Sequence, residues 1–263
     1  MATILIGTSG YSYNEWVGPV YPSGTRQDQF LSLYATQFST VELNFSYYKM
    51  PEKKQLQMMK ESTPSSFGFS IKGHESLTHT IDIEKWKEDA HTFIEAIEPL
   101  VDEGRLEAIL LQFPYSFHYE VNQRRYLDAL LREFSPFPLA VEFRNSMWYN
   151  SRTIEALSNR NVAFTSLDLP QTKGTPPMMD VHTSPIAYVR LHGRNGDSWW
   201  GSDAASRYDY LYSTKELEAI AARIKTIGEK SKKVLVYFNN HRRGQAANGA
   251  KELMSLLCIK GSV

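Results

Sequence analysis

The sequence alternates between short β-like runs and longer helix-like stretches along nearly its whole length. The β-like runs are apolar or alternate apolar with polar residues, whereas the intervening stretches carry the apolar spacing of amphipathic helices. Because consecutive strands joined by a helix lie parallel, this alternation predicts an α/β fold with a parallel sheet. Eight strands are expected, at Thr3–Thr8, Thr40–Phe45, Phe67–Lys72, Leu106–Phe113, Leu139–Phe143, Val162–Leu167, Ile186–Leu191 and Lys233–Phe238.

The number of these units predicts a (β/α)8 barrel of the TIM type. Eight units in about 250 residues match the usual size of such a barrel, whereas a doubly wound open sheet more often stops at about five to seven strands. The segment from Asp168 to Pro177 is too rich in Pro, Gly and Thr for a helix, so a loop is expected in place of helix six. Helices are expected at Thr25–Thr36, Glu52–Glu61, Ile83–Val101, Asn122–Phe134, Ser151–Asn159, Thr214–Ile227 and from about Gln245 to Cys258.

Composition predicts one folded domain, residues 1–263, in a reducing compartment. Hydrophobic residues make up 42% of the 263, and 29 Lys and Arg balance 29 Asp and Glu, which excludes a dominantly basic nucleic-acid binder. The single cysteine, Cys258, cannot form an internal disulfide. The sequence shows no basic leader and no apolar segment of membrane-spanning length, so a cytoplasmic protein is expected.

One line of side chains on each expected strand turns polar toward the carboxyl end of that strand. Residues i and i+2 share a face of a strand, and in a closed parallel barrel one face points to the axis. This line is therefore expected to converge on one mouth of the barrel, the end where barrel enzymes assemble their sites. It comprises Glu42, Asn44, Ser70, Lys72, Gln112, Glu142, Arg144, Ser166, Asp168, Tyr188, Arg190, His192, Tyr237 and Asn239.

The charged members of this line allow two interpretations. As a structural feature they make a self-neutralising ion-pair network, because an unpaired buried charge is costly. As a functional feature they make a site, and the crowding of all six charges at one end favours this for Lys72, Asp168, Arg190 and the neighbouring His192. The six charges are the carboxylates of Glu42, Glu142 and Asp168 and the cations of Lys72, Arg144 and Arg190.

Several short motifs follow one another at the ends of the expected strands. They read Gly7-Thr-Ser-Gly-Tyr-Ser-Tyr13, Phe38-Ser-Thr-Val-Glu-Leu-Asn44, Phe69-Ser-Ile-Lys72, Leu111-Gln-Phe-Pro114, Val141-Glu-Phe-Arg144, Tyr188-Val-Arg-Leu-His-Gly-Arg194 and Tyr237-Phe-Asn-Asn240. In this order they resemble the YecE-like family, a domain of unknown function (DUF72). A string of separate motifs is more specific than any single pattern, and the resemblance covers nearly the whole chain.

The resemblance implies a (β/α)8 barrel and brings no established reaction. Barrels of related shape include metal-dependent endonucleases and sugar isomerases, and DNA binding has been suggested for relatives. Both are analogies at the level of the fold. The chain departs from the family at His241-Arg-Arg243, since another residue often follows the paired Asn.

The loops after the seventh and eighth expected strands predict an anion pocket. They read His192-Gly-Arg-Asn-Gly-Asp197 and Asn239-Asn-His-Arg-Arg-Gly244. In many barrels this corner binds phosphate through loop amides and a helix N-terminus. Arg194 is the strongest candidate to grip phosphate oxygens, whereas Arg242 and Arg243 fit solvated surface charges equally well.

Acid–base chemistry is expected beside this corner. Glu142, Asp168 and His192 suit proton transfer, and Lys72 suits a positioned cation or, if desolvated, a nucleophilic amine, so these four are the candidate catalytic residues. A metal could draw on His74, His79, His192, Glu142 and Asp168, but no tight His pair supports it. No metal ligand is assigned and no cofactor is required, a divalent metal being less favoured. The candidate substrate-binding residues are Glu42, Asn44, Gln112, Arg144, Arg190, Arg194, Asn239, Asn240 and Trp199.

Aromatic side chains crowd the expected rim and can stack on bases or sugars. Packing is the favoured interpretation for Trp16 and Trp148, whereas one of Trp199 and Trp200 is expected to be exposed. The segment Asn195–Ser213 is expected to form a mobile lid. The other rim candidates are Tyr11, Tyr13, Tyr47, Tyr48, Tyr149, Tyr208 and Tyr210.

Three functions remain open on the sequence. The first is a hydrolase-like enzyme that acts on a phosphorylated or nucleic-acid-derived substrate. The second is a non-catalytic module that binds single-stranded nucleic acid or a nucleotide. The third is a carbohydrate-active enzyme that uses two of Glu42, Glu142 and Asp168. The expected partner is an anionic small molecule or single-stranded nucleic acid, and no membrane.

Overall fold

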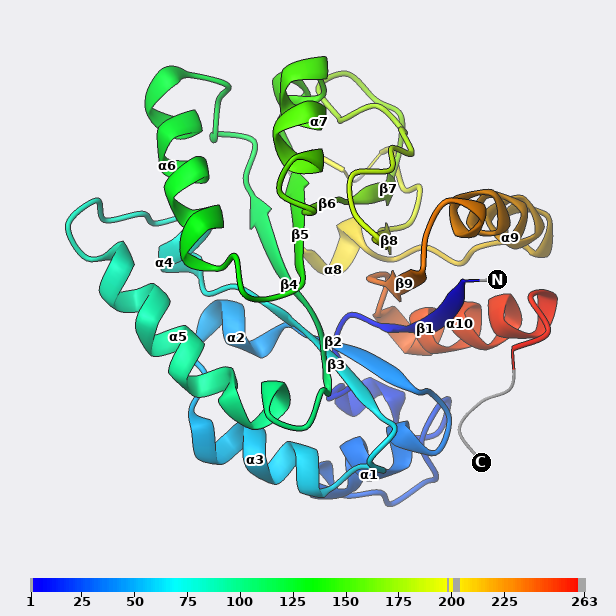
Figure 1. The fold of residues 1–263 in the computed structure, drawn as a ribbon. Coiled ribbons are helices and arrows are strands. Elements are labelled where there is room, and N and C mark those ends of the chain that lie inside the picture. The colour runs from blue at the N-terminus through cyan, green and yellow to red at the C-terminus, as the bar shows by residue number, and fades with distance from the viewer. Residues whose placement is uncertain (1, 198, 201–203, 260–263) are drawn as a thin grey trace.

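The computed structural model describes residues 2–197, 199–200 and 204–259, and its strands form two parallel sheets (Figure 1). The first sheet has the order β1-β9-β8-β7, from β1 (Thr3–Thr8), β9 (Lys233–Phe238), β8 (Ile186–Leu191) and β7 (Ser166–Asp168). The second has the order β2-β3-β4-β5-β6, from β2 (Thr40–Leu43), β3 (Gly68–Lys72), β4 (Leu106–Phe113), β5 (Leu139–Phe143) and β6 (Ala163–Phe164). The pairings are parallel, which confirms the predicted α/β class.

The two sheets meet at two places. Only Thr165 separates β6 from β7, and its amide donates to the carbonyl of Val141 on β5 (2.9 Å). The sixth expected strand is therefore one run of chain that pairs with β5 first and with β8 afterwards. On the opposite side, Ser9 and Glu42 form a parallel bridge just beyond β1, and the Gly10 amide donates to the Glu42 carbonyl (2.8 Å).

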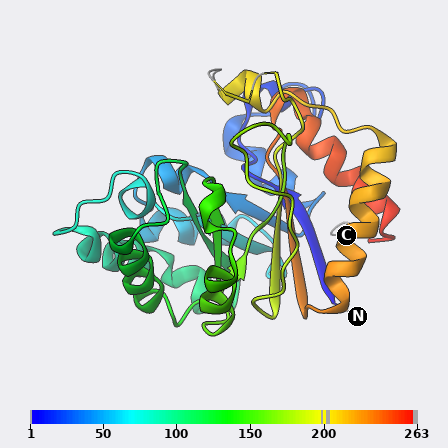
Figure 2. The same ribbon diagram turned by 90° about the horizontal axis from the view of Figure 1, so that it is seen from above.

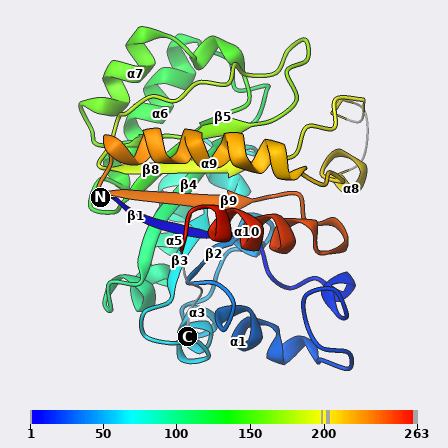
Figure 3. The same ribbon diagram turned by 90° about the vertical axis from the view of Figure 1, so that its right-hand side faces the viewer.

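Helices lie on the outer side of both sheets (Figure 2). All seven expected helices are found, as α1 (Phe30–Ala35), α3 (Lys53–Glu61), α5 (Trp86–Val101), α6 (Val121–Glu133), α7 (Ser151–Ser158), α9 (Thr214–Glu229) and α10 (Gln245–Leu256). The last two lie side by side over β9 and β1 (Figure 3). A capping box of Ser213 and Glu216 starts α9, which satisfies amides that the first turn leaves without partners.

The sequence pattern missed the short elements. A one-turn helix is too short to show an apolar period, so periodicity could not locate it. The predicted absence of helix six is observed, since no helix or strand forms within residues 169–185. The missed helices are α2 (Phe45–Tyr48), α4 (Glu75–Thr78) and α8 (Ala204–Arg207), with 3-10 turns at Asn14–Trp16, Ser146–Trp148 and Arg242–Gly244; a further 3-10 turn, Gln27–Gln29, begins the helix expected at Thr25–Thr36.

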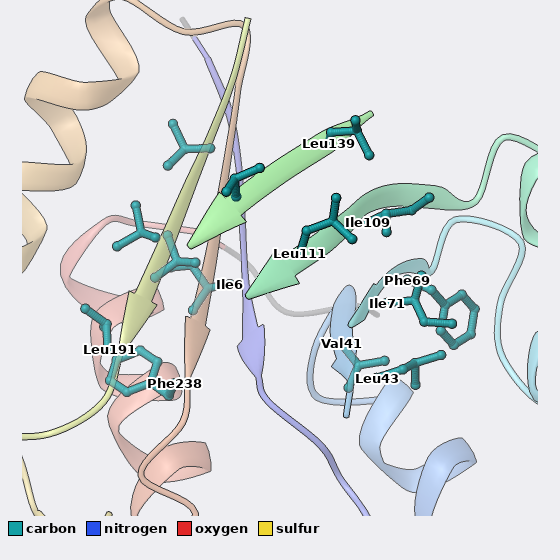
Figure 4. Packing of buried hydrophobic residues seen from close by; sticks show 14 of the residues in the cluster. Ile6, Val41, Leu43, Phe69, Ile71, Ile109, Leu111, Leu139, Leu191 and Phe238 are labelled. Atoms are coloured by element: carbon teal, nitrogen blue, oxygen red, sulfur yellow. The ribbon is translucent and has the colours of Figure 1, made fainter. Parts of the chain in front are cut away.

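The two faces of the sheets bury different side chains. One face of each sheet turns toward the other sheet, and we call it the inner face. On it, the Tyr237 hydroxyl of β9 bonds Thr40 Oγ1 of β2 and Ser70 Oγ of β3, both at 2.8 Å. The outer face carries the large apolar side chains that pack under the helices, among them Val41, Ile109 and Phe238 (Figure 4). The helices thus cover an apolar core, and the inner face is left to smaller and polar residues.

The expected orientation is wrong for Ser166 and Asp168. In the register of β7 and β8, Leu167 lies beside Arg190 on the inner face, and Asp168 lies beside Leu191 on the outer face. Asp168 therefore points toward α9, where Arg223 Nη1 is 3.8 Å from its carboxylate. Polarity misled the prediction, because a polar side chain can face the helices when counter-charges meet it there.

A membrane span is not among the elements described: no helix in this part of the chain combines the necessary length with the necessary apolar character.

Candidate functional site

The guanidinium of Arg190 joins two buried carboxylates in the middle of the inner face. Its Nη2 is 2.7 Å from Glu42 Oε1, and its Nη1 is 2.7 Å from Glu142 Oε2. The Tyr188 and Ser9 hydroxyls donate to Glu42 at 2.7 and 2.5 Å. Glu42 lies on β2, Glu142 on β5 and Arg190 on β8. The side chain of Arg190 therefore connects three strands that are distant in the sequence. The predicted convergence of these three residues is observed.

Glu142 continues this network toward Arg144 and His192. Arg144 Nε lies 2.5 Å from Glu142 Oε1, and His192 Nε2 lies 3.5 Å from the same oxygen. Asn239 Nδ2 lies 3.0 Å from His192 Nδ1, and Arg144 Nη2 lies 3.3 Å from His192 Nε2. We call Glu42, Lys72, Glu142, Arg144, Arg190 and His192 the mouth cluster.

Lys72 differs from the other charged members of the mouth cluster. It ends β3, and its Nζ lies 3.8 Å above the centroid of the Tyr47 ring. No residue in the described ranges accepts a hydrogen bond from its amine, and none places a carboxylate within 4.0 Å of it. Burial, followed by the charge of Arg190, lowers the pKa of Lys72 to about 7.

Glu142 and His192 of the mouth cluster are each fixed in one charge state near neutral pH. Although burial opposes ionisation, Arg144 and Arg190 hold the pKa of Glu142 well below its usual range. Burial, with Arg144 next, lowers the pKa of His192 to about 3, so the ring is neutral. Burial, with Lys72 next, likewise lowers the pKa of His79 to about 4. Of the candidate catalytic residues with a shifted pKa, Lys72 alone changes charge near pH 7.

A cavity of about 220 Å³ opens beside the mouth cluster. Arg144 lies on its wall, with its guanidinium 5.6 Å from the centroid of the Trp199 ring. Trp199 is buried, whereas Trp200 is 49% exposed, as expected for one of the pair. The remaining lining residues are His79, Gln112, Pro114, Tyr115, Pro176, Arg207 and Tyr208.

Asp168 and Arg194 form a separate cluster on the helix side. Arg194 binds Asp168 through both Nε (2.9 Å) and Nη2 (2.6 Å), and Nη1 lies 3.2 Å from Glu216 of α9. Tyr212 donates a further hydrogen bond to Asp168 (2.9 Å), and Arg223 holds Asp180 at 2.6 Å. We call Asp168, Asp180, Arg194, Glu216 and Arg223 the outer cluster. None of the ion pairs of the outer cluster involves a residue of the mouth cluster. The expected meeting of Asp168 with Glu142 is therefore not observed.

The expected anion corner is occupied by ion pairs of the chain. The charge of Arg194 is met by two carboxylates, and Arg242 Nε lies 3.8 Å from Glu15. Asn240 donates to the Tyr210 carbonyl, and its own oxygen is buried without a partner. Asn44 lies at the start of α2, with its side-chain oxygen also buried and unpartnered. These two amides follow the carboxyl ends of β2 and β9. Arg194, in contrast, is bound to carboxylates of the chain and is not available to bind an anion there.

Other expectations concern metals and packing. Within the described residues, no group of three or more His, Cys, Asp or Glu side chains is arranged to hold a metal ion. His74 caps α4 by accepting a hydrogen bond from the Ser76 amide. Trp16 and Trp148 are buried in the core, as expected from packing. The predicted lid, Asn195–Ser213, includes residues 198 and 201–203, which lie outside the described residues.

Sequence reasoning missed Tyr115 and Arg207 as cavity residues. Tyr115 comes directly after the Leu111–Pro114 motif, so its position beyond a strand end was a usable signal. Arg207 ends the one-turn helix α8, which the pattern did not predict. Both line the cavity, and Tyr115 meets Trp200 edge to face with ring centroids 5.7 Å apart.

The fold and the mouth cluster define an α/β protein with a buried ion-paired site at the carboxyl ends of parallel strands. Residues 5–262 match the family model described as protein of unknown function DUF72. The chain therefore belongs to the DUF72 family, which its motifs resembled.

Relatives agree over nearly the whole chain. A DUF72 family protein of Thermotoga maritima MSB8 superposes with a TM-score of 0.90 at 38% identity, covering 97% of this chain and 99% of that one. A DUF72 family protein of Enterococcus faecalis V583 gives 0.88 at 25% identity, covering 98% and 96%. The UPF0759 protein YunF of Bacillus subtilis (strain 168) is 27% identical over 274 residues, 98% of this chain and 96% of the relative. The family description names no reaction, so function has to be argued from the site.

Proposed function

We propose that the two sheets close into one (β/α)8 barrel in a single domain and that the chain is an enzyme whose active site is the mouth cluster. The closure is supported by the bridge between Ser9 and Glu42 and by the run of chain that pairs with β5 and then with β8. The substrate we propose is phosphorylated or nucleic-acid-derived, and the reaction class is hydrolysis.

The observation that carries this proposal is the guanidinium of Arg144 on the wall of a cavity. The mouth cluster sets three cations, Lys72, Arg144 and Arg190, against the two carboxylates of Glu42 and Glu142, and its histidine is neutral. The cluster is therefore positive when Lys72 is protonated and balanced when its amine is neutral, and in neither state does it have an excess of negative charge. A phosphate can take a bidentate hydrogen bond from Arg144 at the cavity wall.

Lys72 is the group we assign to proton transfer. General acid–base catalysis is most effective when the pKa of the group lies near the working pH, and among the shifted candidates this holds for Lys72. The neutral amine would accept a proton from water as the water oxygen attacks the ester. The resulting ammonium would return that proton to the leaving oxygen.

Calorimetry with inorganic phosphate, a nucleoside monophosphate and a short single-stranded oligonucleotide tests the binding step. We expect at least one to bind, and Arg144→Gln to weaken it by more than tenfold. Arg242→Gln is the matched control, because Arg242 lies near Glu15 rather than on the cavity wall. Absence of binding by all three probes would remove the proposal.

Release of the alcohol from a model phosphomonoester or phosphodiester tests the reaction. We expect Lys72→Met to lower turnover by about 10²- to 10⁴-fold, the usual contribution of a general acid or base. Binding without turnover would instead support a binding module. That second candidate is favoured by one observation: Tyr115 and Trp200 are both about half exposed at the cavity, where rings can stack on bases.

The geometry does not favour the carbohydrate-active alternative. Glu42 and Glu142 both bind Arg190, and the two arginines lower the pKa of Glu142, whereas a glycosidase needs one carboxyl group with a raised pKa. Asp168 cannot replace either carboxylate, since it faces α9.

A further inference from the structure

The amine of Lys72 is unlike every other cation on the inner face. Lys233 lies at the opposite end of the strands and is bound to Glu107 at 2.5 Å, and Arg144 and Arg190 each bind a carboxylate. Lys72 has neither a carboxylate nor a hydrogen-bond acceptor among the described residues. An ion pair is therefore not what holds this lysine in the mouth, and its amine has no acceptor that would retain its proton.

The surroundings of Lys72 connect its amine to the cavity wall without an ion pair. Its Nζ lies over the face of Tyr47, and Tyr47 meets the ring of His79 edge to face with centroids 4.8 Å apart. His79 lies on the cavity wall together with Gln112 and Arg144. Burial and the charge of Arg190 both disfavour the ammonium. A desolvated lysine beside another cation is the arrangement that activates amines as nucleophiles.

We propose that Lys72 captures the open-chain aldehyde of a phosphorylated sugar as an imine. The inference rests on the proposed function for recognition of the phosphate, and it adds a carbonyl carbon as the reacting atom. It concerns sugars with a free aldehyde, whereas the hydrolysis proposed above concerns esters without one. Arg144 and the cavity would hold the phosphate, and Lys72 would meet the carbonyl.

The covalent step balances without any external oxidant or reductant. The nitrogen lone pair of Lys72 attacks the carbonyl carbon, and the carbonyl oxygen takes up a proton to give a carbinolamine. Loss of water then forms the carbon–nitrogen double bond. The neutral imidazole of His79 and the side-chain amide of Gln112 are the cavity groups that can exchange or hold the protons of this step.

Reductive trapping tests the proposal directly. The whole chain is incubated with ribose 5-phosphate and cyanoborohydride, which supplies hydride to an imine, and is then analysed by intact mass and peptide mapping. We expect one adduct, with the mass of the sugar phosphate less one oxygen atom, located on Lys72. Lys72→Arg should lose it, and Lys233→Arg, the matched control on the same face, should retain it.

Two further arms separate this inference from the proposed function. Ribitol 5-phosphate keeps the phosphate but has no aldehyde, so it should bind and protect Lys72 from trapping. Unphosphorylated ribose should label Lys72 at least tenfold more slowly, a difference that Arg144→Gln should abolish. Binding of ribitol 5-phosphate without any adduct from ribose 5-phosphate would overturn the imine and leave the proposed function standing.

The remaining outcomes are equally decisive. Equal labelling by ribose and ribose 5-phosphate would keep the amine chemistry and overturn phosphate recognition at the mouth. Labelling spread over surface lysines without preference for Lys72 would overturn the inference. Circular dichroism of Lys72→Arg and its unchanged urea midpoint establish that loss of the adduct is not loss of the fold.

Discussion

The mouth cluster and the outer cluster both pair arginines with carboxylates, but they balance their charges differently. In the outer cluster, Arg194 and Arg223 face three carboxylates, so every cation has a partner. In the mouth cluster, Arg144 and Arg190 form ion pairs with both carboxylates, and Lys72 forms none. The outer cluster has the composition of a structural network, whereas the mouth cluster includes one amine without an ion pair.

Exposure separates the two clusters as well. The side chains of Arg190, Glu42 and Glu142 are at most 2% exposed, whereas Arg194 and Glu216 are 30% and 23% exposed. Arg194 can be solvated if it loses Asp168, whereas Glu42 and Glu142 cannot be solvated if they lose Arg190; Asp168 itself is as buried as these two carboxylates. This difference predicts the order of the effects that follow.

The largest expected effect belongs to Arg190→Met. It leaves the buried carboxylates of Glu42 and Glu142 without their common partner, and breaking a buried pair in this way costs about 3–5 kcal/mol. The free energy of unfolding in urea measures this loss. A loss no greater than that of an outer-cluster variant would contradict the comparison, and Lys49→Met, in an exposed pair with Glu52, is the control expected to change nothing measurable.

Asp168→Asn should destabilise the chain less, by about 1–3 kcal/mol. Arg194 keeps Glu216 and gains access to water, and Arg223 keeps Asp180, so no cation becomes both buried and isolated. The same urea titration measures the change, and turnover or trapping at Lys72 should be unaffected. Loss of activity without loss of stability would restore Asp168 to the catalytic candidates.

The contrast also shows how far the sequence could predict this molecule. Strand ranges such as Leu106–Phe113 and Lys233–Phe238 are matched at both ends, because β-branched runs bounded by polar residues carry strong local information. Alternation then placed Glu42, Glu142 and Arg190 on one face correctly. These features depend on the chain's own periodicity, which is visible in one sequence.

Pairing between distant residues was beyond that reasoning. Arg194 was expected to meet phosphate, but Glu216 and Asp168 reach it from elements that lie 22 and 26 residues away. Asp168 itself was assigned to the wrong face because its partner, Arg223, is on a helix whose position depends on tertiary packing. Which of the three cations of the mouth cluster stays without a carboxylate is likewise decided only when the strands meet.

Lys72→Met should stabilise the folded chain, by about 1–2 kcal/mol at pH 6, because it removes a partly buried charge that forms no ion pair and that Glu142 and Glu42 offset only in part. Below pH 7 both the folded and the unfolded lysine are protonated, so the burial cost is fully present. Between pH 7 and the ordinary pKa of 10.5 the folded amine loses its proton and the unfolded one keeps it, so the stability of the native chain rises relative to the variant. The groups that surround the amine are Arg190 and Arg144, Glu142 and Glu42, and the rings of Tyr47 and His79.

Urea titrations of both chains across pH 6 to 10 measure this difference. The gap should shrink as the pH rises, and a gap that is constant or widens would show that Lys72 is held by a partner after all. Lys233→Met is the matched control, since its ion pair with Glu107 should make it destabilising where Lys72→Met is stabilising.

The smallest expected effect tests the contact between Lys72 and Tyr47. An ammonium over an aromatic face gains about 0.5–1 kcal/mol, so the ring partly offsets the burial that disfavours the charge. Tyr47→Leu keeps an apolar wall but removes the ring, and it should shift the pKa of Lys72 further down by less than about one unit. The pH profile of reductive trapping at Lys72 measures the shift, with Tyr47→Phe, which keeps the ring, as the control expected to match the native profile. A higher pKa of Lys72 in Tyr47→Leu would mean that the ring excludes water from the amine more than it attracts the charge. The low pKa of Lys72 would then depend on Tyr47 rather than on the pairing of the arginines with both carboxylates.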